Sequence, residues 1–100
     1  MKRVVIKKLV WDAWNIKHIA SHHVVPEEVE DVCYTGNAQH EEANKGRIRV
    51  TGVTQKGHIL SAFLDPEPEE GVYYVVSARP ASRPERKDYQ AWVERGEKAA

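Results

Sequence analysis

The spacing of apolar residues predicts a short strand and then a helix at the start of the chain. Residues 4–10 are β-branched and apolar enough for a short strand or an extended arm. Asp12 is a plausible N-cap, and the residues behind it that recur at helical spacing are Trp14, His18, Ile19 and His22. Residues 23–25 break this helix.

A second helix is expected directly afterwards. Pro26 suits its first turn, and Glu27 and Glu28 suit the positive end of the helix dipole. Its apolar face is formed by Val29, Val32 and Cys33, and Gly36 marks its end.

Beyond Gly36 the apolar period changes to two, which is typical of strands. Residues 47–51 alternate between polar and apolar, residues 55–57 indicate a hairpin turn, and residues 58–64 make the returning strand. Residues 65–71 combine prolines with acids and predict an exposed loop. Residues 72–78 are rich in strand formers on both faces, which favours a central, well-covered strand. Residues 37–43 are a further candidate strand.

The last element is a helix with a clear start signal. Ser82 and Glu85 form a capping-box pattern, and the helix is expected to run to about Arg95 and end at Gly96. The elements together predict an α+β fold with two N-terminal helices, a three- to four-stranded antiparallel sheet and a C-terminal helix. A length of 100 residues without a repeat or linker predicts a single domain, residues 1–100.

The charge balance argues against a broad nucleic-acid-binding surface. Lys+Arg and Asp+Glu number 15 each, whereas general nucleic-acid binders show a basic excess. We therefore expect no direct DNA binding by this chain alone. Positive charge still gathers at a few places, namely Lys2, Arg3, Lys7, Lys8, Arg47, Arg49, Arg79, Arg83, Arg86 and Lys87. A small basic site on a neutral molecule is compatible with this distribution.

The chain carries no signal for a membrane or an export route. No apolar run approaches the roughly 20 residues that cross a bilayer, and the apolar stretch at the N-terminus is too short for a signal peptide. Cys33 is the single cysteine, so no intramolecular disulfide can form and a reducing compartment fits best. The expected location is the cytoplasm.

The first candidate site is the pair His18 and His22, which helical spacing places on one face. Such a pair can supply two ligands to a zinc ion. No third ligand follows at a recognisable spacing, and residue 19 is isoleucine where zinc proteases have glutamate. Ordinary hydrogen-bonded histidines are therefore the favoured interpretation, and no metal or other cofactor is expected.

The second candidate site is the arginine group Arg79, Arg83 and Arg86. Arg79 closes a predicted strand, and the other two lie three residues apart in the first turns of the last helix. Cations are disfavoured at this end of a helix, so a bound phosphate would explain them. The alternative is that Arg86 pairs with an acid such as Glu85 and that Arg83 is solvated.

The third candidate group lies on the predicted hairpin. Alternation puts Arg47, Arg49 and Thr51 on one face of a strand, and His58 follows the turn. A solvated sheet face is the commoner explanation of such a pattern. The aromatic residues Trp11, Trp14, Trp92, Tyr73 and Tyr74 are interpreted as packing residues and not as platforms for bases.

Three blocks of the chain resemble the BrnT-type toxin family. The first is the helical opening, with Trp11, Asp12, Asn15, His18, Ile19, His22 and residues 26–29. The second is the hairpin, with Arg49, Val50, Gly52, Gly57 and Leu60. The third and most specific comprises residues 76–79, Ala81, Glu85, Arg86 and Tyr89. The resemblance runs from about Leu9 to Tyr89.

The resemblance implies a RelE-like fold and a ribonuclease toxin of a type II toxin–antitoxin pair. Such a toxin halts translation by cutting RNA without a metal, and a small ribbon-helix-helix antitoxin neutralises it. For such a reaction we expect Arg79 and Arg83 to bind the phosphate with support from Arg49, and His22 or His58 to act as acid–base, because histidine titrates near neutrality. The residues expected to contact the substrate are Arg47, Ser77, Arg86 and Tyr89. The alternative is an inactive relative that retains only antitoxin or other protein binding. Zero net charge, Val53 and His58 favour that alternative.

Overall fold

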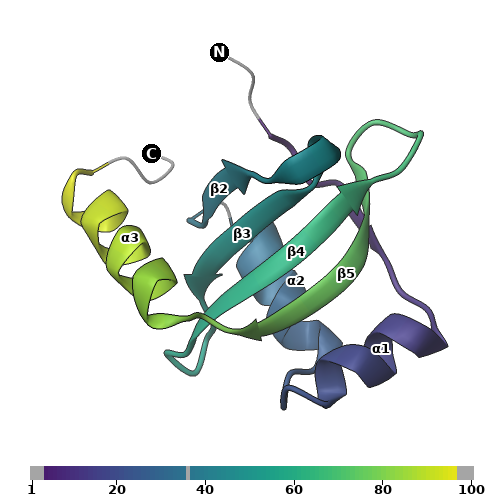
Figure 1. Cartoon of the computed structure of the whole chain (residues 1–100), viewed down its shortest axis with the longest axis horizontal. Coiled ribbons are helices and arrows are strands. Elements are labelled where there is room, and N and C mark those ends of the chain that lie inside the picture. Colours follow the sequence, from purple (N-terminus) through teal and green to yellow (C-terminus); the bar gives the residue numbers. More distant parts are fainter. Residues whose placement is uncertain (1–3, 36, 97–100) are drawn as a thin grey trace.

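The computed structural model describes residues 4–35 and 37–96, and over these residues the fold is α+β (Figure 1). The helices are α1 (Ala13–Ala20), α2 (Pro26–Tyr34) and α3 (Arg83–Glu94), with a short 3₁₀ turn at Asn44–Gly46. The strands are β1 (Lys8–Val10), β2 (Gln39–Glu42), β3 (Ile48–Val53), β4 (Ile59–Pro66) and β5 (Val72–Pro80). No helix of the described residues is long and apolar enough to span a membrane.

The strands form one five-stranded mixed sheet in the order β1-β5-β4-β3-β2. Strands β2 to β5 are antiparallel, as predicted, and the strand expected within residues 37–43 is present as β2. The expected count of three to four strands is wrong, because β1 joins the edge of the sheet parallel to β5. Only Val75 and Ala78 are buried in β5, so that strand is not covered on both faces as predicted.

The core lies between one face of the sheet and the helices α1 and α2. Apolar residues that alternate along β3 and β4, together with two from β5, pack against helix residues: Ile48, Val50, Leu60, Ala62, Leu64, Val75, Ala78, Ile19, Val29 and Val32. A Cβ on Gly52 would lie 3.1 Å from both Ala38 Cβ and Val32 Cγ1, so glycine lets this layer close. Cys33 is buried beside it, and burial, with the charge of Glu30, raises the pKa of its thiol to about 12. That thiol is therefore unreactive.

Helix α1 begins as the sequence predicts. Asp12 accepts from the backbone N–H of Asn15 at 2.9 Å, and the Asn15 side chain accepts from the Asp12 N–H at 2.8 Å. The amide of Asn15 is fully buried and donates to the carbonyls of Val10 and Val75 at 2.9 and 3.0 Å. One side chain therefore starts the helix and joins it to β1 and β5.

The end of α1 differs from the prediction. The helix stops at Ala20, so His22 lies in the following turn, although its ring still contacts that of His18. The backbone N–H groups of His22 and His23 bond to the carbonyls of Ile19 and Ala20, which tightens the turn. His23 then adopts the left-handed conformation, with φ of 64°, and reverses the chain. For the second helix, α2, the predicted end at Gly36 lies outside the described residues.

Helix α3 lies on the face of the sheet opposite α2 and covers only one end of it (Figure 1). Ser82 is the N-cap and forms the expected capping box with Glu85. The helix ends as predicted, with Gly96 at φ of 72°. The remainder of this face, which we call the open face, carries the polar side chains of β3, β4 and β5.

Candidate functional site

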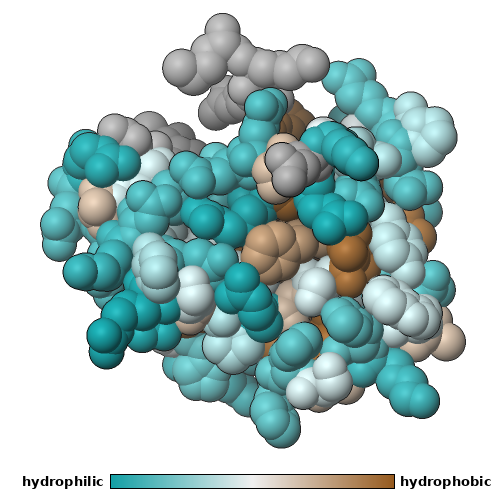
Figure 2. All heavy atoms as spheres, viewed as in Figure 1, coloured by the Kyte–Doolittle hydropathy of each residue, from teal (hydrophilic) through white to brown (hydrophobic). Residues whose placement is uncertain are grey.

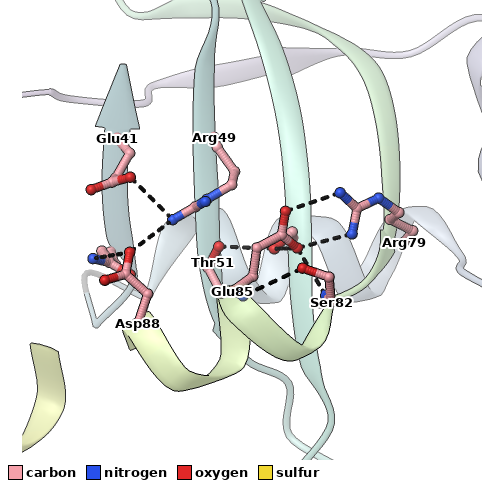
Figure 3. Close-up of polar contacts among 9 residues, drawn as sticks. Glu41, Arg49, Thr51, Arg79, Ser82, Glu85 and Asp88 are labelled. Carbon is pink, nitrogen blue, oxygen red and sulfur yellow. Dashed lines mark hydrogen bonds and ion pairs between the residues drawn. The ribbon is translucent and has the colours of Figure 1, made fainter. Parts of the chain in front are cut away.

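The open face brings together arginines that are far apart in the sequence. Arg49 pairs across the strands with Phe63, and Phe63 pairs with Ser77. One step along, Thr51 pairs with Ser61, and Ser61 pairs with Arg79. Arg49 and Arg79 therefore lie on the same face, separated by the central strand β4 (Figure 3).

Arg79 is bound to a carboxylate of α3. Its Nη1 and Nη2 donate to Glu85 Oε1 and Oε2, each at 2.9 Å. Glu85 also accepts from the Ser61 hydroxyl at 3.0 Å and from the Ser82 backbone N–H at 2.9 Å, and Thr51 and Ser61 share a further hydrogen bond. Burial by itself would raise the pKa of Glu85, but these hydrogen bonds outweigh it and lower the pKa to about 2. Arg79 therefore anchors α3 to the sheet.

Arg49 is held more loosely. Its Nη2 lies 3.3 Å from Glu41 Oε1 and 3.4 Å from Asp88 Oδ2. The Arg49 side chain is 17% exposed, whereas those of Glu41 and Asp88 are 49% and 46% exposed. Gln39 also donates to Asp88, at 3.4 Å. Among the described residues, the buried Nε of Arg49 has no hydrogen-bond partner, so its hydrogen-bonding capacity is not filled.

Arg47 lies further along the open face, where β3 begins. It makes a two-contact ion pair with Asp65 of β4, with Nε to Oδ1 at 2.7 Å and Nη2 to Oδ2 at 3.1 Å. The hydrogen bond from Arg47 lowers the pKa of Asp65. Both side chains are about two-fifths exposed, at 42% and 40%, so solvent screens this pair.

The two arginines at the start of α3 are exposed. Arg86 donates to the carbonyl of Ala81 at 3.0 Å and does not pair with Glu85, because Arg79 already occupies that carboxylate. Within residues 4–35 and 37–96, the side chain of Arg83 makes no hydrogen bond or ion pair. Arg83 is thus a cation available to a ligand.

The candidate histidines do not join the arginines. His58 is exposed and lines a groove of about 880 Å³ between α2 and the β3–β4 turn, together with His23. The half-buried His22 ring packs edge-on against His18, with centroids 5.5 Å apart. Over the described parts of the chain, no group of three His, Cys, Asp or Glu side chains is placed to hold a metal.

Ser77 and Tyr89 occupy different environments. Ser77 is half-buried on the open face beside Phe63. Tyr89 is buried, and its hydroxyl lies 3.4 Å from the Asn37 carbonyl while its ring packs against Trp92. Burial raises the pKa of Tyr89. This environment fits a packing role better than contact with a substrate.

The sequence reasoning missed the acidic partners of the arginines and the aromatic ring between them. Glu41, Glu85, Asp88 and Phe63 complete the open face. The alternation of β4 was a usable signal for Phe63, because Leu60, Ala62 and Leu64 fill the core side of that strand. The carboxylates carried no comparable signal, since their pairing depends on where α3 docks.

The comparisons with known proteins identify the fold. No family model matches the chain, and no curated protein does so either. A solved structure does: the crystal structure of the Brucella abortus ribonuclease toxin BrnT superposes with a TM-score of 0.61 at 22% sequence identity, over 76% of this chain and 97% of that chain. The chain has the BrnT fold. The fold that the resemblance implied is therefore confirmed, and nearly the whole of the BrnT structure is matched.

Proposed function

We propose that this chain is a metal-independent endoribonuclease toxin that halts translation and is neutralised by a small ribbon-helix-helix antitoxin. The observation that carries the proposal is the near-complete match to the fold of BrnT, a ribonuclease toxin. The open face supports it, because Arg49 and Arg79 lie on one side of the sheet with the exposed Arg83 at the adjoining helix start.

The proposed chemistry uses groups of this face. The 2′-hydroxyl of RNA attacks the adjacent phosphate while a base takes its proton, and cations stabilise the charge that develops. The bond from phosphorus to the 5′-oxygen of the next nucleotide breaks, and that oxygen leaves with a proton from an acid or from water, so the products are a 2′,3′-cyclic phosphate and a 5′-hydroxyl. Arg49 and Arg83 are proposed to bind the phosphate, and Arg79 to hold α3 beside it. Arg47, Ser77 and Arg86 are proposed to contact neighbouring nucleotides, whereas Tyr89 supports α3 from within.

Carboxylates are better placed than histidines to accept the proton. Glu41 and Asp88 flank Arg49, whereas His58 lines the groove beside α2. We therefore propose Glu41 or Asp88 as the base, with His22 and His58, the histidines expected from the sequence, as the alternatives. The need for a 2′-hydroxyl would leave DNA intact.

A second candidate function has its own support. The head groups of Arg47, Arg49 and Arg79 all face internal carboxylates, and the formal net charge is zero. A chain that has lost catalysis and only binds an antitoxin or another protein would tolerate such pairing. The two functions share the fold and differ in whether RNA is cut.

The deciding experiment incubates the purified protein with structured RNA, single-stranded RNA and matched DNA in EDTA. Wild type is expected to cut RNA and leave DNA intact. The double variant Arg49→Gln, Arg83→Gln should lose about 100-fold or more in rate, the usual scale for removing charge stabilisation. Lys56→Gln is the matched control, because Lys56 is an exposed cation beside the α2 groove.

Each part of the proposal fails on a different result. Cleavage that EDTA abolishes would contradict a metal-free reaction, and undiminished cleavage by the double variant would contradict the site. No cleavage by wild type, together with tight binding of a neighbouring ribbon-helix-helix protein, would favour the second function. Growth arrest on expression, relieved by that neighbour, would favour the toxin.

A further inference from the structure

Phe63 is the only phenylalanine in the chain, and it is not part of the core. It lies in the middle of the central strand β4 and is half-buried on the open face. The partly buried apolar side chains that pack against the core are Val4, Ile6, Trp11 and Tyr73. A large apolar ring placed outside the core of a small domain gives up burial that would have stabilised the fold.

Cations surround this ring. The guanidinium carbon of Arg79 lies 5.0 Å from the centroid of Phe63, and Arg49 is its cross-strand neighbour. Because both Nη atoms of Arg79 donate hydrogen bonds to Glu85, the guanidinium is held in place against the Phe63 ring. Because the protein already orders the Arg79 and Phe63 side chains without a ligand, the entropic cost of binding a ligand there is lower.

Phe63 also lines a groove of about 680 Å³ at the end of the face away from α3, with Ala43, Lys45, Arg47, Asp65 and Pro66. Arg47 neutralises Asp65 through their two-contact pair, which leaves the charge of Lys45 in excess. Figure 2 shows an apolar area in the middle of this face, enclosed by hydrophilic side chains. The groove thus combines one aromatic ring with a small net positive charge.

We propose that Phe63 is a stacking platform for one base of a single-stranded RNA, with Lys45, Arg47 and Arg49 around the adjoining phosphates. The proposal rests on the proposed function and names a subsite within it. An aromatic ring flanked by cations matches a nucleotide, whose base is flat and whose phosphate is anionic. A protein partner would require a wider apolar area than this polar-rimmed ring offers.

The test measures binding of a labelled single-stranded RNA by fluorescence anisotropy across a salt series. Phe63→Leu should weaken binding by about fivefold to a hundredfold, the range for loss of one stacked base. Phe63→Trp should retain or strengthen it. Trp14→Leu removes an exposed aromatic from α1, on the other side of the sheet, and should change nothing.

Two readouts separate stacking from a merely structural effect. Phe63→Leu should leave the dependence of affinity on salt unaltered, because no charge is lost, and its melting temperature should stay close to wild type. On an RNA of the same length that lacks bases at the bound positions, Phe63→Leu and wild type should bind equally.

Specific results would overturn the inference. Equal RNA binding by wild type and Phe63→Leu, with cleavage retained, would refute the stacking site and leave the ribonuclease proposal standing. An absence of RNA binding by wild type would remove both. If sedimentation showed that Phe63→Leu abolishes self-association while RNA affinity is unchanged, the ring would belong to an interface between copies, and the stacking site would be wrong.

Discussion

At the scale of single residues, two arginines of one face are held in contrasting ways. Arg79 meets Glu85 through two short contacts to a carboxylate that is only 11% exposed, and charge-assisted pairs of that kind are strong. Arg49 touches two half-exposed carboxylates at 3.3 and 3.4 Å, and pairs of that kind contribute about 0–1 kcal/mol. Arg49 can therefore exchange its acidic partners for a phosphate, whereas Arg79 cannot do so without releasing α3.

The first prediction concerns the carboxylate that competes for Arg49. Asp88→Asn should strengthen RNA binding by about two- to fivefold, because the loss of one weak pair is worth up to about 1 kcal/mol. Glu94→Gln makes the same charge change on the exposed side of α3 and should have a smaller effect. Anisotropy titrations at one salt concentration measure both, and equal affinities would show that Asp88 does not mask Arg49.

The roles of residues could be predicted where they depend on alternation along a strand. The predictions failed where a role depends on how α3 docks onto the sheet. Period-two spacing correctly placed Arg47, Arg49 and Thr51 on one side of β3, because side chains alternate along any strand. Glu85 was predicted to be a capping residue and a possible partner of Arg86, but not the partner of Arg79. The contact of Glu85 with Arg79 forms when α3 folds back onto the sheet. The sequence around Glu85 does not show how the helix will pack there.

At the scale of elements, α3 is attached to the sheet mainly through polar contacts. Glu85 reaches Arg79 and Ser61, and Asp88 reaches Arg49 and Gln39. An apolar contribution comes from Tyr89, which is buried and whose hydroxyl lies 3.4 Å from the Asn37 carbonyl. The attachment of this helix should therefore depend on the ionisation of Glu85.

The second prediction follows from the pKa of Glu85, which folding lowers from 4.5 to about 2. A carboxyl with a lowered pKa stabilises the fold fully above its unfolded value and loses that contribution as pH falls toward the folded value. The free energy of unfolding should thus fall by on the order of 2–3 kcal/mol between about pH 4.5 and pH 2, beyond the effect of other carboxyls.

The measurement is urea unfolding of wild type and Glu85→Gln across this pH range. The variant should be less stable at neutral pH and should show a shallower loss in acid. Glu94→Gln serves again as the charge-matched control and should follow wild type. Parallel profiles for wild type and Glu85→Gln would mean that the carboxylate does not stabilise the docked helix.

Element boundaries were predictable where a cap marks them and not where the backbone reverses unexpectedly. Asp12, Ser82 and Gly96 were correctly identified, since caps satisfy backbone groups with neighbours in sequence. The end of α1 was misplaced because the chain reverses through His23 at a positive φ, which residues other than glycine rarely adopt. A short strand or extended arm was predicted over residues 4–10, but the parallel pairing of β1 with β5 was missed because the two strands are far apart in the chain.

At the scale of the whole molecule, the neutral net charge hides an uneven distribution. Carboxylates of α2 border the groove that contains His58, and three arginines of the sheet are matched to acids. The exposed cations near the open face are few, chiefly Lys45, Arg83, Arg86 and Lys87. A ligand with many phosphates would therefore meet few free positive charges.

The third prediction is a shallow salt dependence of RNA binding. With about three or four phosphates neutralised, the slope of log K against log salt should lie between about −2 and −3, at roughly −0.7 for each contact with a single strand. RNA-binding titrations at several salt concentrations, from about 50 to about 300 mM, measure this slope. A slope steeper than about −5 would mean that the internally paired arginines also release their acids.

The parallel pairing of β1 has a consequence for how the chain is made. Lys8 pairs with Val72, and Asn15 bonds to Val75, so the first strand and the first helix find their partners only once β5 has been synthesised. At about 5–20 residues per second, the opening segment waits several seconds on the ribosome. A chain cut short before β5 cannot complete its sheet. For a protein proposed to stop translation, an incomplete product that ends before β5 would also lack Arg79 and Arg83 of the proposed site.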